Sequence, residues 1–224
     1  GWGVELDDKL VREANEAARK NGLANRAQFF QRNVFDADLS KVDVIFMWLF
    51  PELQRLLRPK ILAEARPGTR VVTNMFDMGT WQPDEVDDNP ALALRAWIVP
   101  ANVAGQWRWN LSLAGETLDF AAVLEQQFQK VEGVARTGNR RRVLHDFKLA
   151  GDELSFSLLV DVDRVGYTRY QFSGKVRGER IEGKALVYHP VARGAEEYRY
   201  TEVPWRAERV ANSAYFAPTG LEAR

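Results

Sequence analysis

Apolar residues are spaced differently in the two parts of the chain. Before about residue 100 they recur every three or four positions or form short continuous runs, as in helices and buried parallel strands. After Pro100 they alternate with polar residues in segments punctuated by glycine, as in antiparallel strands. We therefore expect two domains, 1–100 and 101–210, followed by a C-terminal tail over 211–224.

The first domain is expected to alternate strands with helices. Its predicted elements, in order, are a strand ending at Glu5, a helix over about Lys9–Asn21, strands over Ala27–Gln31 and Val42–Trp48, a helix from Pro51, and strands over Thr69–Asn74 and Ala96–Pro100, the last at a sheet edge. This order predicts an α/β fold with an incomplete Rossmann-like, mostly parallel sheet. Such domains have a strand, a glycine-rich turn and a helix before the strand that ends at Glu5. We therefore interpret the chain as an N-terminally truncated fragment.

Several segments of this domain carry expectations about burial. Val42–Trp48 is nearly all apolar, which predicts a central strand buried on both faces. Each helix is expected to bury one apolar stripe. The stripes are Leu10, Val11, Ala14, Ala17 and Ala18 in the first helix, and Leu53, Leu56, Leu57, Ile61 and Leu62 in the second. The polar segment over about Gly79–Asn89 is expected to be a loop that leaves the sheet.

The second domain is predicted to be all-β, an antiparallel β-barrel or sandwich. Its alternating segments are Gly105–Leu113, Thr117–Ala122, Val123–Val131, Arg142–Leu149, Leu154–Val160, Tyr167–Phe172 and Ile181–Tyr188. Gly105-Gln106-Trp107 resembles the Gly-x-Trp that begins many small lipocalin-like barrels, and Trp205–Ala207 is expected to close the barrel against it. The apolar positions expected inside are Phe120, Leu124, Phe128, Phe156, Leu158, Tyr170 and Phe172. We interpret them as a packed core, with a ligand cavity as the alternative.

Composition argues against several classes of function. The chain has no cysteine and only two histidines, which argues against disulfides, thiolate chemistry and a structural zinc site, so no metal is expected. Its 31 basic and 31 acidic residues give a net charge of zero, so no nucleic-acid partner is expected. No apolar run approaches the length of about 20 residues that spans a bilayer, so no membrane partner and a cytoplasmic location are expected.

Four arginines of the second domain surround a predicted turn at Thr137–Asn139. They are Arg136, Arg140, Arg141 and Arg142. A hairpin tip with solvated arginines explains them, and binding of an anionic partner is the alternative.

Glu5 lies where a nucleotide ligand is often held. An acidic residue at the tip of the second strand of a nucleotide-binding sheet can hydrogen-bond both ribose hydroxyls. Asp7 and Asp8 follow, and either can cap the helix behind it. The alternative, that Glu5 is an exposed strand-end carboxylate, has about equal weight from these residues alone.

Five segments of the first domain, in this order, resemble the class I S-adenosylmethionine (SAM)-dependent methyltransferases. They are Gly3–Asp7 (Gly-Val-Glu-Leu-Asp), Val34–Leu39 (Val-Phe-Asp-Ala-Asp-Leu), Ile45–Pro51, Pro67–Val72 (Pro-Gly-Thr-Arg-Val-Val) and Phe76–Trp81 (Phe-Asp-Met-Gly-x-Trp). The resemblance covers roughly residues 1–100. A similar layout occurs in protein-lysine methyltransferases outside the SET class.

The resemblance implies SAM as the cofactor and assigns roles to individual residues. Glu5, with Leu6 beside it, would hold the ribose, and Val34 and Phe35 would pack near the adenine. Asn33 stands where the family usually has an acid that accepts a hydrogen bond from the adenine amino group. An amide oxygen can also accept this bond, but without a charge.

The acceptor side of the implied site lies after the next two strands. Trp48, Phe50, Asn74 and Asp77 are the candidates for contact with the acceptor, and Trp48 and Phe50 have core packing as their alternative. No Ser-His-Asp arrangement is present in this half, because neither histidine lies there, and the catalytic residue is unknown.

The primary hypothesis is SAM-dependent methyl transfer to an unidentified acceptor, with a protein lysine as one conceivable acceptor. Activity is expected to be impaired in this chain, because the glycine-rich turn is missing and Asn33 replaces an acid. The alternative is a non-catalytic module in which the second domain binds a small ligand or a protein.

Overall fold

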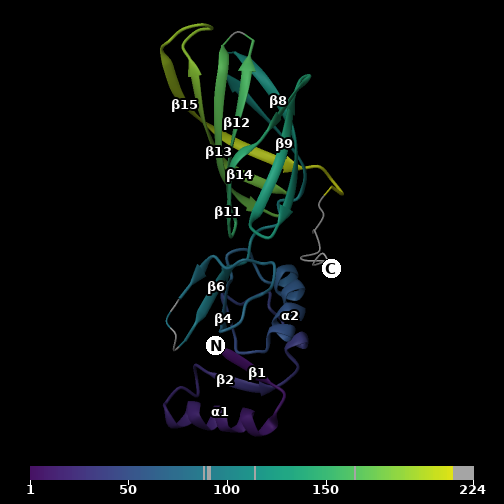
Figure 1. Ribbon diagram of the computed structural model, residues 1–224, viewed down its shortest axis with the longest axis vertical. Coiled ribbons are helices and arrows are strands. Elements are labelled where there is room, and N and C mark those ends of the chain that lie inside the picture. The colour runs from purple at the N-terminus through teal and green to yellow at the C-terminus, as the bar shows by residue number, and fades with distance from the viewer. Residues whose placement is uncertain (88, 90–91, 114, 164, 214–224) are drawn as a thin grey trace.

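The computed structural model describes residues 1–87, 89, 92–113, 115–163 and 165–213. The chain forms two bodies that follow one another along the long axis of the molecule, an α/β half at the N-terminal end and a β-barrel beyond it (Figure 1). The expected tail over 211–224 falls largely outside the described residues. Among the described residues, no helix has the length and apolar character needed to cross a membrane.

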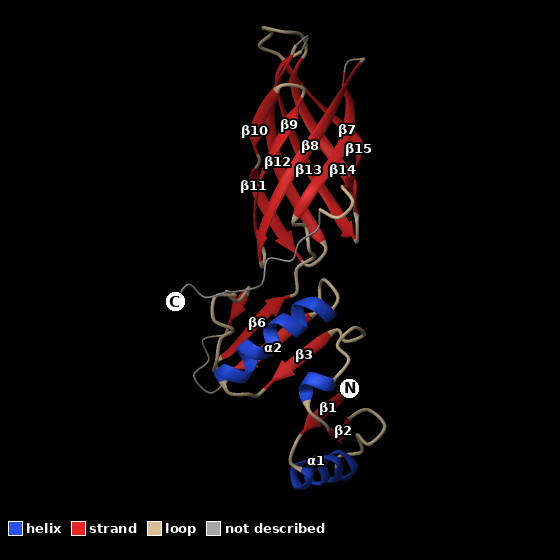
Figure 2. Ribbon diagram, turned by 90° about the vertical axis from the view of Figure 1, so that its right-hand side faces the viewer, coloured by secondary structure: helices blue, strands red, loops and turns tan. Residues whose placement is uncertain are grey.

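The α/β half contains nine short elements. In order they are β1 (Trp2–Glu5), α1 (Asp8–Lys20), β2 (Gln28–Gln31), the 3-10 helix η1 (Val34–Asp36), β3 (Val44–Met47), α2 (Pro51–Glu64), β4 (Arg70–Asn74), β5 (Glu85–Val86) and β6 (Leu94–Ile98). β1 and β2 form one sheet, and the order β3-β4-β6-β5 forms another. α2 lies against the four-stranded sheet (Figure 2).

The predicted mostly parallel sheet is present only as two parallel pairs. β1 pairs with β2 and β3 pairs with β4 in parallel, but β6 joins β4 and β5 joins β6 in antiparallel. The prediction that 96–100 is an edge strand was wrong, because β6 lies inside its sheet. β5 takes the edge, so the segment expected to leave the sheet returns to it. No described strand joins the two sheets.

The prediction that Val42–Trp48 is buried on both faces was also wrong. Val44 and Phe46 of β3 are 49% and 58% exposed, whereas Met47 is 4% exposed. The buried side contributes to the core formed with α2, where Leu57 and Ile61 lie. On the other side, no described element covers β3. The apolar composition of the strand is real, but burial also needs a covering layer.

α1 begins and ends where the sequence predicts, and its packing is polar in part. Asp7 is the N-cap and accepts a hydrogen bond from Lys9 N at 2.8 Å. Of the expected stripe only Val11 and Ala18 are buried, and Leu10 is 48% exposed. Asn15 satisfies the β2 backbone, since its side chain accepts from Phe29 N at 3.1 Å and donates to Phe29 O at 2.8 Å.

The expected stripe of α2 is shifted around the helix. Leu57, Ile61 and Leu62 are buried as predicted, but Leu56 is 65% exposed. Gln54 and Arg58 are buried in its place. Arg58 is buried because it turns toward the segment after β4, as described below.

The barrel is a nine-stranded antiparallel sheet that is nearly closed. Its strands are β7 (Gly105–Leu113), β8 (Glu116–Gln127), β9 (Lys130–Thr137), β10 (Arg140–Val143), β11 (His145–Ala150), β12 (Glu153–Val162), β13 (Gly166–Arg177), β14 (Arg180–Pro190) and β15 (Tyr198–Arg209). Each pairs with its neighbour in the chain, apart from β10 and β11. The two predicted strands over 117–131 were wrong, since β8 continues through Val123 and Val131 belongs to β9.

Two contacts bring the ends of this sheet together. β15 pairs with β7 through Glu208 with Arg108 and Arg209 with Trp107, as expected for closure near Trp205. β10 and β11 are separated only by Leu144, whose N–H donates to Gly133 O at 2.9 Å. β10 pairs with β9 and β11 pairs with β12, so one interrupted strand bridges both edges of the sheet.

The barrel interior is filled by its own side chains. Trp109, Phe156, Phe172 and Trp205 form a cluster in which neighbouring ring centroids are 4.9 to 6.1 Å apart. Tyr170 stacks on Phe172, and its burial raises the pKa of the phenol far above the ordinary value. A packed core therefore describes the interior, as it does in other small eight- or nine-stranded barrels.

The hairpin between β8 and β9 leaves the barrel and enters the α/β half. Phe128 lies at its tip, and the prediction that it belongs to the barrel core was wrong. Its ring stacks on Trp81 with 5.7 Å between centroids and 10° between planes. Gln129 accepts from Trp81 Nε1 at 3.0 Å and donates to Gln82 O at 3.0 Å. We call these contacts of Phe128 and Gln129 the hairpin joint.

A second contact between the halves depends on the absence of side chains. Gly151, in the turn between β11 and β12, has a φ of +58°, and a Cβ there would lie 3.1 Å from Gly68 Cα. Gly151 O also accepts from Ala101 N at 2.7 Å. A larger residue at position 151 would separate the backbones at this point, because Cβ atoms do not approach backbone so closely.

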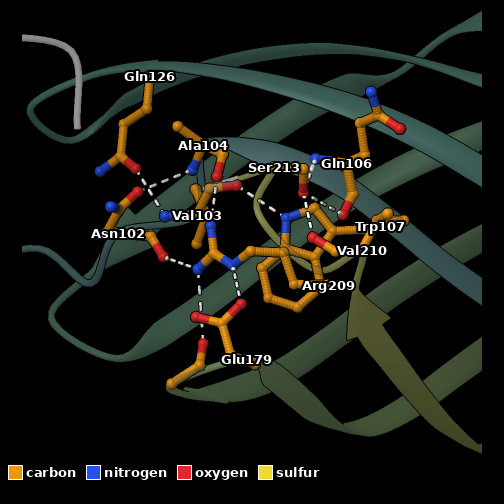
Figure 3. A network of polar contacts seen from close by, with 11 residues as sticks. Asn102, Val103, Ala104, Gln106, Trp107, Gln126, Glu179, Arg209, Val210 and Ser213 are labelled. Atoms are coloured by element: carbon orange, nitrogen blue, oxygen red, sulfur yellow. Dashed lines mark hydrogen bonds and ion pairs between the residues drawn. The ribbon is translucent and has the colours of Figure 1, made fainter. Parts of the chain in front are cut away.

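The strand that closes the barrel ends in a buried arginine (Figure 3). Arg209 donates to the backbone oxygens of Ala104 and of Asn102, the second at 2.6 Å. Its Nε lies 3.0 Å from a carboxylate oxygen of Glu179, and its guanidinium lies over the Trp107 ring at 4.5 Å. Burial lowers the pKa of Arg209, and the charge of Glu179 opposes this shift.

The division of the chain near Pro100 leads to a prediction about independent folding. Residues 101–213, expressed alone, are expected to fold as the barrel, because their core is contributed by their own strands. Only Phe128 would lose its packing partners. Circular dichroism and proton NMR of this segment would check the prediction, and a disordered spectrum would contradict it.

Candidate functional site

The carboxyl end of β1 is shaped by its own acidic residue. Glu5 is exposed, and its Oε1 accepts hydrogen bonds from Leu6 N at 2.6 Å and Asp7 N at 3.0 Å. Within the described residues, Oε2 of Glu5 has no hydrogen-bond partner. The turn therefore fixes one carboxylate oxygen and leaves the other directed to solvent. Leu6 is 67% exposed beside it.

The carboxyl end of β2 lies directly beside Glu5. Glu5 pairs with Gln31 in register, Arg32 N donates to Glu5 O at 3.0 Å, and Gln31 Nε2 donates to Leu6 O at 3.1 Å. Asn33 follows, and its Oδ1 accepts from Phe35 N at 3.0 Å, which caps η1. The structure thus brings together the residues of the expected cofactor site, although Glu5 and Asn33 both bond first to their own loops.

Val34 and Phe35 lie differently within this loop. Val34 is half-buried and packs against the core of the four-stranded sheet. Phe35 is 39% exposed. Further along, Leu39 N donates to Glu64 Oε2 at 3.4 Å. The loop after β2 therefore connects the two sheets that no strand joins.

The charged groups of this loop remain ionised at neutral pH. Ser40, through its hydroxyl and its backbone N–H, lowers the pKa of Asp38. Lys60, whose Nζ lies 2.7 Å from the carboxylate, lowers the pKa of Glu64. Neither carboxyl group is a suitable proton acceptor near neutral pH, since a general base works best with a pKa near the operating pH.

The carboxyl end of β3 presents two aromatic side chains to solvent. Trp48 is 72% exposed and Phe50 is 75% exposed, so the alternative of core packing was wrong for both. Phe50 is also the N-cap of α2, and Pro51 takes the first helical position. Large aromatic side chains exposed together are unusual in an isolated domain and are typical of binding surfaces.

The carboxyl end of β4 is held by polar contacts. Asn74 is 5% exposed and donates through Nδ2 to Leu92 O. Asp77 is exposed, and its Oδ1 accepts from Gly79 N at 2.9 Å. Asn74 therefore positions the connection between β4 and β6, whereas Asp77 lies where a ligand can reach it.

A buried arginine behind this segment was not predicted. Arg58 of α2 donates to Met78 O, and its guanidinium lies 5.4 Å from the centre of the Phe128 ring. Trp97 Nε1 donates to Trp81 O at 2.8 Å. These contacts and the hairpin joint fix residues 76–82 from behind. No local pattern could identify them, because Arg58 and Phe128 are 70 positions apart in sequence.

The described residues contain no group of three or more His, Cys, Asp or Glu side chains arranged to hold a metal ion. The arrangement instead offers an acidic strand tip, a polar loop and exposed aromatic rings at neighbouring strand ends. Such a surface can position a ligand and an acceptor, which is what an in-line displacement chiefly requires.

Comparison with known proteins identifies the class. Residues 1–85 match the family model of the ANTKMT methyltransferase domain. Residues 1–85 are therefore part of a class I SAM-dependent methyltransferase domain, and SAM is the cofactor of that class.

Individual relatives agree with this class. The chain is 40% identical over 84 residues to a protein-lysine N-methyltransferase of Saccharolobus islandicus, covering 38% of this chain and 52% of that protein. It is 31% identical over 81 residues to the adenine nucleotide translocase lysine N-methyltransferase of Mus musculus, covering 36% and 35%. The chain therefore spans about half the length of the first relative and about a third of the second.

A solved structure is also similar. It is an RNA methyltransferase from Salinibacter ruber in complex with S-adenosyl-L-homocysteine, with 36% sequence identity and a TM-score of 0.45, covering 46% of this chain and 67% of that one.

Proposed function

We propose that the α/β half binds SAM at the carboxyl ends of β1 and β2 and serves methyl transfer to a protein lysine. The observation that carries the proposal is the free Oε2 of Glu5, which stands at a strand tip beside the loop of Asn33. A carboxylate with one oxygen fixed by backbone amides and the other free is suited to accept from ribose hydroxyls. The names of the two lysine methyltransferase relatives support the acceptor.

The residues around Glu5 have separate roles in this proposal. Leu6 and Phe35 offer apolar surface to the adenosyl group, and Asn33 offers Oδ1 to the adenine amino group. Asn33 Oδ1 already accepts from Phe35 N, so it has one lone pair left and no charge to strengthen the bond. We therefore expect the polypeptide of residues 1–224 to bind SAM weakly, in the high-micromolar range or above.

The exposed aromatic side chains at the end of β3 provide the acceptor side. When bound, SAM supplies an electrophilic methyl group. Trp48 and Phe50 offer faces along which the aliphatic chain of a lysine can lie, and aromatic faces also attract the ammonium head. Asp77 lies after the neighbouring strand and can accept a hydrogen bond from the amine. Asn74 acts indirectly by holding the end of β4.

Replacing Glu5 by Ala tests the cofactor part of the proposal. SAM binding is expected to weaken by about 1–3 kcal/mol, the scale of a hydrogen bond to a charged group. Fold stability should be nearly unchanged, because Glu5 is exposed. Saturation-transfer NMR and calorimetry would measure binding, with Glu13→Ala, an exposed carboxylate of α1, as the control. Equal binding by the Glu5 variant and the parent protein would show that Glu5 is not the ribose ligand.

The acceptor part is tested separately. The protein is incubated with SAM carrying an isotopic label in the methyl group and with lysine-containing peptides, and methyl-lysine is sought by mass spectrometry. Label on lysine that disappears in Trp48→Ala supports the acceptor surface. SAM binding without any label on lysine would contradict the lysine acceptor while leaving the cofactor site intact.

A further inference from the structure

The outer wall of the barrel carries two adjoining hollows over β7, β8 and β9. The larger has a volume of about 890 Å³ and the smaller about 340 Å³. Arg108, Ala121 and Arg136 line both hollows. Because the barrel interior is packed with aromatic side chains, these hollows lie on the outside of the wall, and the argument below concerns the smaller one.

A row of arginines crosses the wall at this point. Arg108 pairs in register with Ala121, Ala121 with Arg136, and Arg136 with Arg141. Neighbouring strands are about 4.8 Å apart, so Arg108 and Arg136 stand about 10 Å apart with the short side chain of Ala121 between them. The row therefore has a gap at Ala121 that two guanidinium groups border.

None of these three arginines is neutralised within the part of the chain that the structure describes. Neither Arg108 nor Arg141 has a side-chain hydrogen bond or ion pair there, and Arg136 donates only to the backbone oxygen of Gly138, at 2.7 Å. The fourth arginine of this region behaves differently, since Arg140 pairs with Asp163 at 2.6 Å. Three like charges in a row are unfavourable unless an anion joins them.

An apolar row runs beside the basic row. Val123 pairs in register with Val134, and Val134 with Val143, one step of two residues along each strand from the arginines. These valines are 41%, 48% and 56% exposed. Val123, Val134 and the three arginines line the smaller hollow, whose lining includes no acidic side chain. The acids Asp119 and Glu208 border only the larger hollow, and Glu208 is paired with Arg206 at 3.1 Å.

We propose that the smaller hollow binds a small organic phosphate, with its phosphate group between Arg108 and Arg136 and its apolar body on Val123 and Val134. Guanidinium groups match phosphate oxygens in paired hydrogen bonds. The volume lies at the low end of the range for small-molecule sites. An anion over Ala121 neutralises the row, and an apolar body removes the valines from water.

Binding of 1-naphthyl phosphate to the whole protein tests this proposal, with inorganic phosphate and 1-naphthol as its separate parts. Calorimetry is expected to show at least tenfold tighter binding of 1-naphthyl phosphate than of either part. Methyl NMR signals of Ala121, Val123 and Val134 are expected to shift. Arg136→Gln should weaken binding at least tenfold, whereas Arg180→Gln, an exposed arginine elsewhere on the barrel, should not change it.

Ala121→Glu provides a second variant whose fold is protected. It places a carboxylate between Arg108 and Arg136, so it should preserve or raise stability while abolishing binding. Three results would overturn the proposal. They are equal binding of inorganic phosphate and 1-naphthyl phosphate, equal binding of 1-naphthol that ignores Arg136→Gln, and shifts confined to residues outside the hollow.

Discussion

Replacing Phe128 by Ala is expected to lower the stability of the α/β half by about 3–5 kcal/mol, the range for removing a buried phenylalanine from a core. The ring is 6% exposed and packs in the core of that half, although it belongs to a barrel hairpin. The residue has a φ of +56°, and Ala meets the same backbone cost as Phe there. The change therefore isolates the loss of the stack on Trp81.

Hydrogen exchange followed by mass spectrometry would locate the effect of Phe128→Ala. Exchange should accelerate in residues 76–82 and in β6, and remain slow in β12 and β13. Phe50→Ala is the matched control, because that ring is 75% exposed and should change stability by less than about 0.5 kcal/mol. Faster exchange in the barrel strands alone would contradict the assignment of Phe128 to the other core.

Replacing Arg209 by Ala is expected to destabilise the barrel by about 3–5 kcal/mol, as found when one partner of a buried ion pair is removed. The side chain of Arg209 is 2% exposed, and its loss leaves the carbonyl groups of Asn102 and Ala104 without their donor. Arg209→Lys should recover only part of this stability, because an ammonium group cannot reach several acceptors in a plane.

Arg206→Ala is the control for this prediction. Arg206 lies three positions earlier on β15, and its pairs with Glu182 and Glu208 are about half exposed, so its loss should cost less than about 1 kcal/mol. Chemical denaturation of both variants would measure the difference. Equal effects of the two substitutions would show that the buried network contributes no more than a surface pair.

Local patterns in the sequence predict the elements well. Alternation and glycine place β7 at Gly105–Leu113 without error, and the Asp7 cap and Pro51 locate both helices. Continuous alternation through Ala122 and Val123 carries no boundary, and the predicted break there was wrong. Pattern reports which residues can be strands, whereas the ends of a long strand depend on its partners.

Long-range placement is harder to predict. Phe128 and Arg58 meet across 70 positions, and Val44 and Phe46 are exposed although their composition predicts burial. For the candidate site, Glu5 and Asn33 lie side by side as the resemblance implies. The bonds that each makes to its own loop depend on rotamers, which residue type alone does not determine.

The up-and-down order of the barrel has a consequence for how this protein can diversify. Successive turns alternate between the two ends, so the turns at Phe128, Gly151 and Gly178 share one end while those after β9, β12 and β14 share the other (Figure 1). The first end meets the α/β half at Trp81 and Gly68, where an added residue would collide. Insertions, length variation and grafted peptides are therefore tolerated at the far end, which is free to evolve without disturbing the methyltransferase half.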